Sequence, residues 1–152
     1  AGGGTSLYDA VYLVTEQKML EEEGRKTLVI LSDGSDLTSK RSFEEALRMA
    51  YKSEAAVYAI STTRFGAEID HEGDKLLKRL TESTGGTVFF PHSSNSLGPT
   101  FETINKELRS QYNIAYVPKN KKKDGEFRKL EVKVRRDDIR VRHRKGYFAP
   151  LD

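Results

Sequence analysis

Cysteine is absent from this 152-residue sequence. Its absence excludes disulfides, thiolate metal sites and cysteine nucleophiles together. No apolar run approaches the roughly 20 residues of a membrane helix, so we expect no membrane span. A Gly-x-Ser-x-Gly nucleophile elbow is also missing, and no glycine-rich segment ends in the Gly-Lys-Ser/Thr of a phosphate-binding loop. We therefore expect a protein that is not an enzyme.

Charge is plentiful but unevenly distributed. Charged residues make up 32% of the chain, and its formal net charge is +3. Residues 119–145 hold 13 Lys and Arg against 5 Asp and Glu, so the rest of the chain is acidic. The basic segment either docks on an acidic partner or keeps an exposed face solvated.

The first two-thirds of the chain alternates helical and buried-strand patterns. We expect helices over residues 6–22, 43–52, 74–83 and 97–110, and strands over residues 27–32, 55–61 and 87–90. The strand segments are continuous apolar runs, which are typical of parallel strands covered by helices on both faces. The pattern predicts an α/β fold, a three-layer Rossmann-like parallel sheet flanked by helices.

The pattern changes after Gln111. A strand over residues 112–117 is expected to stop at Pro118, and residues 130–134 and 139–143 alternate apolar with polar side chains. Such alternation predicts antiparallel strands, joined here near Asp137-Asp138. We therefore assign residues 1–111 to a partial α/β domain and residues 112–152 to an antiparallel β extension packed on it.

Two segments carry oxygen ligands at places where parallel sheets bind them. Thr5 follows a glycine turn at the start of the first helix, and Asp33-Gly34 directly follows the first buried strand. Ligands collect at the carboxyl ends of parallel strands, and carboxylate and hydroxyl oxygens suit Mg²⁺. Each segment also has a simpler interpretation, because Thr5 and Ser6 can cap a helix and Asp33-Gly34 can form a turn.

The same two segments resemble the second and third metal-site motifs of von Willebrand factor type A domains. Three later segments are similar to a bacterial group labelled von Willebrand type A-related. They are Gln111-Tyr112-Asn113-Ile114-Ala115-Tyr116, Phe127-Arg128-Lys129-Leu130-Glu131-Val132 and the ending from Val141 to Pro150. The resemblance covers essentially the whole chain and implies a non-enzymatic, adhesion-type protein-binding module in an extracellular or periplasmic location.

The resemblance implies a metal-ion-dependent adhesion site. Thr5 and Asp33 would contact the ion or its waters, Ser6 and Asp36 would lie around them, and a carboxylate of a protein partner would complete the shell. The family's first motif, Asp-x-Ser-x-Ser, does not occur in this sequence. Because Thr5 and Asp33 alone offer too few oxygens, we expect Mg²⁺ or Mn²⁺ to bind this chain weakly or not at all.

The family's first strand would lie upstream of Ala1 and would pair with residues 27–32. Without it those residues form an open edge, which we expect the β extension or a second copy of the chain to cover.

Other polar clusters have a simpler interpretation than a site. Asp36 is expected to brace its loop, and the run from Asp70 to Asp74 is expected to be solvated. The alternative function is nucleic-acid or acidic-surface binding by the basic hairpin. The binding residues would be Arg140, Arg142 and Arg144, with Tyr147 and Phe148 beside them for stacking on bases. Salt would weaken such binding, whereas a chelator would weaken metal bridging.

Overall fold

The computed structural model describes residues 4–65 and 71–151 and has the α/β architecture predicted from the sequence. β1 (Thr27–Ser32), β2 (Ala56–Ser61) and β3 (Val88–Phe89) form a parallel sheet in the order β1-β2-β3. Its strands are the continuous apolar runs of the sequence, and β3 is shorter than expected. The glycine turn at residues 2–3 and Asp70 lie outside the described residues.

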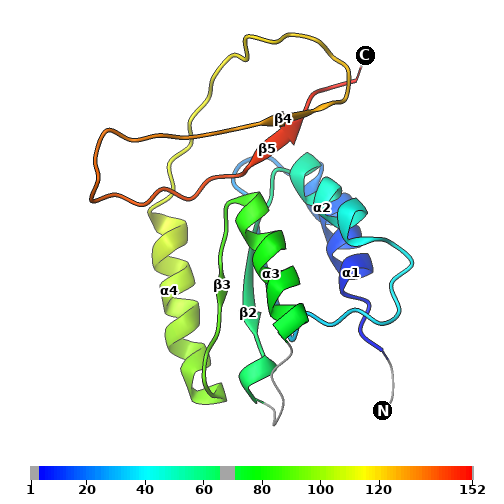
Figure 1. Cartoon of the computed structure of the whole chain (residues 1–152), viewed down its shortest axis with the longest axis vertical. Helices are drawn as coiled ribbons and strands as arrows, with labels where there is room; N and C mark the ends of the chain where they lie inside the picture. The colour runs from blue at the N-terminus through cyan, green and yellow to red at the C-terminus, as the bar shows by residue number, and fades with distance from the viewer. Residues whose placement is uncertain (1–3, 66–70, 152) are drawn as a thin grey trace.

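Helices cover both faces of the sheet, which makes the fold three-layered (Figure 1). α1 (Leu7–Val14), α2 (Phe43–Lys52) and α3 (His71–Thr84) share one core with Ile30, Val57 and Ala59. α4 (Leu97–Arg109) packs its Ile104 on the opposite face, against Tyr58 and Ile60. Within the described residues, no helix is long and apolar enough to cross a lipid bilayer.

β1 has an open edge and a partly open face. Val29 pairs with Tyr58 and Leu31 with Ile60, so these side chains point to the face that α4 covers. Val29 and Leu31 are nevertheless 37% and 53% exposed, because α4 lies over β2 and β3 instead. In the described part of the chain, no strand pairs with the outer edge of β1.

The C-terminal extension does not cover this edge, so that part of the expectation is wrong. β4 (Phe127–Lys129) and β5 (Gly146–Phe148) form a separate antiparallel pair at the amino-terminal end of the parallel strands (Figure 1). Aromatic packing holds the pair there, with the Tyr51 ring of α2 centred 5.1 Å from the Phe127 ring. Cover of the β1 edge by a second copy stays a prediction.

The first helix is shorter than the expected range of residues 6–22. α1 ends at Val14, and residues Thr15–Met19 continue as a π-helical turn, η1. The buried Thr15 hydroxyl donates to the carbonyls of Val11 and Tyr12 at 2.7 and 3.0 Å, which competes with regular α-helical hydrogen bonds. α3, in contrast, begins at His71, three residues before the predicted start.

The C-terminal strands are also shorter than the alternation predicts. Residues 112–117 form no strand, and all of them are exposed, with Tyr112 92% exposed. The hairpin arms pair regularly in β4 and β5 and then separate, although the turn at Asp137-Asp138 agrees with the sequence. Val132 and Val134 lie on no core, so burial does not hold these arms together.

Candidate functional site

The loop that follows β1, residues 33–41, lies against the first turn of α1 and is called here the Asp33 loop. The carbonyl of Thr5 accepts hydrogen bonds from the amides of Leu37 and Thr38 at 2.9 and 3.3 Å. Both segments stand at the carboxyl end of β1, where sequence analysis places the site. The structure thus brings Thr5 and the Asp33 loop together through the backbone.

Asp36 joins the Asp33 loop to α1. Its carboxylate accepts hydrogen bonds from the amides of Leu7, Tyr8 and Ser39 and from the Ser39 hydroxyl. Partial burial opposes ionisation, but these donors outweigh it and hold the pKa of Asp36 below its ordinary value. Asp36 therefore caps α1 from a distant loop, as its expected bracing role requires.

Ser6, which the sequence offers as a helix cap, does not cap α1 with its side chain. Its hydroxyl lies 2.6 Å from the Thr38 hydroxyl and makes no capping bond to α1, because Asp36 takes the amides at the helix start. Asp9, in the first turn of α1, accepts hydrogen bonds from the amides of Lys40 and Arg41. Both side chains therefore hold the Asp33 loop in place.

Asp33 differs from Asp9 and Asp36 in how much of its carboxylate is used. Its Oδ1 accepts the amide of Ser35 at 3.0 Å, and within the described residues Oδ2 accepts no hydrogen bond. The Asp33 side chain is half-buried, and Thr5 is exposed. An oxygen of Asp33 and the hydroxyl of Thr5 are thus available to a ligand.

A second polar cluster lies at the carboxyl end of β2, and sequence analysis missed it. The Asp74 carboxylate of α3 accepts hydrogen bonds from the buried hydroxyls of Ser61 and Thr63 at 2.5 and 3.2 Å. The sequence did contain a signal for this cluster, because Ser61 stands at the end of a buried strand in the same way as Ser32. Because the three groups satisfy one another, they fix the start of α3 against β2.

The described part of the acidic run that contains Asp74 begins α3. Glu72 forms an exposed ion pair with Lys75 at 2.6 Å, whereas Asp74 accepts hydrogen bonds from the buried hydroxyls of Ser61 and Thr63. In the regions the structure describes, no three His, Asp or Glu side chains lie close enough to share an ion.

The basic hairpin is held by carboxylates of the α/β domain. Arg142 pairs with Glu107 of α4, and Arg144 pairs with Glu54 at 2.8 Å. Phe148 packs its ring 6.1 Å from Tyr51 and is not free to stack on a base. The sequence analysis put Arg140, Arg142 and Arg144 on one ligand-binding face, but two of them attach the hairpin to the domain.

Replacing Arg142 with alanine should therefore destabilise the fold, whereas Arg140→Ala should not. Glu107 is 23% exposed at its side chain, and loss of Arg142 would leave this carboxylate without its cation. We expect a cost of about 1–2 kcal/mol, between that of exposed and buried pairs. Urea unfolding measures it, and equal stabilities of the two variants would contradict a structural role for Arg142.

The sequence matches no protein family model and no curated protein. Part of the fold is similar to a crystal structure described as an uncharacterized membrane spanning protein from Vibrio fischeri. The two chains are 20% identical, and the similarity covers 62% of this chain and 52% of the other, with a TM-score of 0.48. This chain thus matches about half the length of that protein.

Proposed function

We propose that this chain is a non-enzymatic, protein-binding module of the von Willebrand type A kind, with its site at the carboxyl end of β1. The observation that carries the proposal is the contrast among the three aspartates of α1 and the Asp33 loop. Asp9 and Asp36 each accept hydrogen bonds from two or more backbone amides, whereas Asp33 keeps one carboxylate oxygen unused among the described residues.

The roles of individual side chains follow from this contrast. Asp33 supplies an anionic oxygen and Thr5 a hydroxyl, while Asp36 and Ser6 hold the loop and the first turn of α1 together. A bound Mg²⁺ or Mn²⁺ would supply positive charge and an open coordination position for a carboxylate of a partner protein. Recognition by such a bridge makes and breaks no covalent bond.

Affinity for the metal alone should be low, because Thr5 and Asp33 are few ligands for an ion that prefers about six oxygens. We expect a dissociation constant of about 10⁻⁴ to 10⁻³ M, as in weak all-oxygen sites. Titration with Mn²⁺, followed by paramagnetic broadening of backbone amide signals, should affect Thr5 and residues 33–35 first.

Asp33→Ala should abolish this broadening while the remaining amide signals keep their positions. Asp137→Ala is the matched control, because Asp137 is an exposed aspartate in the hairpin turn. The proposal fails if Mn²⁺ broadens the amide signals of Asp33→Ala as it does those of the unmodified protein, or if the first signals to broaden are those of the hairpin. Micromolar affinity for Mg²⁺ by isothermal titration would contradict the assignment of only two protein ligands.

A further inference from the structure

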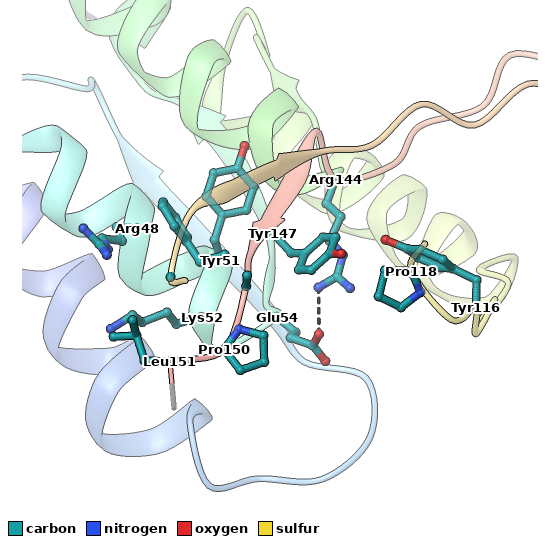
Figure 2. A pocket seen from close by; sticks show the side chains of 13 residues that line it. Arg48, Tyr51, Lys52, Glu54, Tyr116, Pro118, Arg144, Tyr147, Pro150 and Leu151 are labelled. Carbon is teal, nitrogen blue, oxygen red and sulfur yellow. Dashed lines mark hydrogen bonds and ion pairs between the residues drawn. The ribbon is translucent and has the colours of Figure 1, made fainter. Parts of the chain in front are cut away.

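A groove of about 650 Å³ lies between the C-terminal end of α2 and the C-terminal extension (Figure 2). α2 leads into the start of β2, so this groove lies at the opposite end of the sheet from Asp33. Its walls come from the C-terminal half of α2 with Glu54, from Tyr116, Pro118 and Gly125, and from Arg144 with residues 147–151. No residue of the groove belongs to the proposed site at Asp33.

One half of the groove is aromatic and proline-rich. The rings of Tyr116 and Tyr147 are 6.5 Å apart in an edge-on arrangement, and Pro118 lies beside Tyr116 (Figure 2). Arg144 lies over the Tyr147 ring at 5.9 Å and is itself held by Glu54 at 2.8 Å. This ion pair fixes the position of the Tyr147 ring and leaves the groove wall ordered.

The other half is positively charged. Arg48 and Lys52 line it from the C-terminal half of α2, across Pro150 from Tyr116 and Tyr147 (Figure 2). Within the described residues, neither cation pairs with a carboxylate, and the Arg48 guanidinium lies over the Phe148 ring at 4.6 Å. Since Glu54 is occupied by Arg144, the described side chains that line this groove leave a net positive charge for a ligand.

The backbone beside the aromatic half is also unused. Residues 112–118 form no strand, and none of them makes a backbone–backbone hydrogen bond to another described residue. Val117 is 82% exposed in this segment. Amides and carbonyls of an extended segment can pair with the backbone of a second extended chain, as in strand addition.

We propose that this groove binds an extended, acidic, proline-containing segment of a partner protein. Proline rings of the ligand pack against Tyr116, Tyr147 and Pro118, in the way that aromatic grooves take polyproline helices. Carboxylates of the ligand lie at Arg48 and Lys52, where charge complementarity sets its direction. The groove is a second binding surface, independent of any metal at Asp33.

Fluorescence polarisation with a labelled peptide, Glu-Asp-Glu-Pro-Pro-Leu-Pro, tests the proposal. Saturable binding is expected below about 1 mM, with at least about tenfold weaker binding of two other peptides. One carries lysine in place of each acidic residue, and the other carries serine in place of each proline. Amide signals of Tyr116, Tyr147 and Lys52 should shift on binding, and those of residues 33–35 should not.

A charge exchange separates a binding role from a structural one. The double variant Arg48→Glu, Lys52→Glu should no longer bind the acidic peptide and should bind the lysine peptide instead. A variant that is merely misfolded cannot show this reversal. Lys106→Glu with Arg109→Glu is the matched control, because it reverses two cations in the last turn of α4. Tyr116→Ala, at a half-exposed side chain outside any strand, should weaken binding severalfold.

The proposal is overturned if the acidic peptide does not bind below about 1 mM, or if all three peptides bind equally. Unchanged peptide preference in the charge-reversed variant overturns it as well. Chelator has no effect on the expected binding, so failure here is distinguishable from failure of the metal site at Asp33.

Discussion

Gly34→Ala is expected to destabilise the protein by about 3–5 kcal/mol, because a side chain at this position has nowhere to go. Gly34 has a φ of +86°, in the left-handed region that favours glycine. A Cβ there would overlap the carbonyl of Gly73 and lie 2.7 Å from its Cα. These atoms are backbone in the first turn of α3 and cannot rotate away.

Gly24→Ala separates the two causes of this cost. Gly24 has a φ of +85°, but its Cβ would meet no atom within 4 Å. The variant therefore loses only the backbone freedom of glycine, about 1–2 kcal/mol. In thermal unfolding experiments, Gly24→Ala should lower the Tm by about 2–8 °C, and Gly34→Ala should lower it by clearly more. Equal losses would mean that the Asp33 loop does not pack against α3.

The same contact links stability to the proposed site. Gly34 follows Asp33 directly, so a displaced loop moves the carboxylate away from Thr5. In any folded fraction of Gly34→Ala, Mn²⁺ should broaden the amide signals of residues 33–35 less than in the unmodified protein. In Gly24→Ala the same signals should broaden as in the unmodified protein. If both variants lose stability but only Gly34→Ala loses Mn²⁺ binding, the loss of binding is due to the changed position of the Asp33 loop.

Local signals in the sequence were sufficient for the layers of the fold. Continuous apolar runs identify β1 and β2, and the Ser-x-x-Glu spacing of Ser42 and Glu45 is a capping-box pattern that α2 uses at its start. The signals are local in each case, because the interacting residues are neighbours in the chain or share one strand. Burial on both faces then selects the parallel arrangement.

Long-range contacts account for what the sequence did not show. The amide of Tyr8 donates to Asp36, 28 residues away, so the position of Ser6 just before the helix was a poor guide to capping. Arg142 and Arg144 similarly resemble a free basic surface in the sequence, but their partners Glu107 and Glu54 lie in distant elements. Charge patterning alone does not distinguish arginines that form internal ion pairs from arginines that form a binding surface.

Asp36→Ala is the second substitution with a large expected effect, about 2–4 kcal/mol. It leaves the amides of Leu7 and Tyr8 without an acceptor and removes two bonds to Ser39. Loss of a helix cap and of hydrogen bonds to a charged group both contribute. Asp33→Ala is the matched control in the same loop, because Asp33 accepts one amide and should cost about 1 kcal/mol.

The contribution of Asp36 should also depend on pH in a defined direction. Its pKa is lowered in the folded state, so the unfolded chain binds the proton more tightly. The stabilisation is therefore complete above the unfolded value, about 3.9, and is lost as the pH falls through the lower folded value.

Urea unfolding between about pH 7 and pH 2 measures this dependence, with Asp36→Asn as the comparison because asparagine does not ionise. The stability difference between the two proteins should be constant above about pH 5 and should shrink below about pH 4. A difference that grows on acidification would mean that the folded state raises the pKa of Asp36. In that case burial, and not the donors from α1 and Ser39, would dominate at this carboxylate.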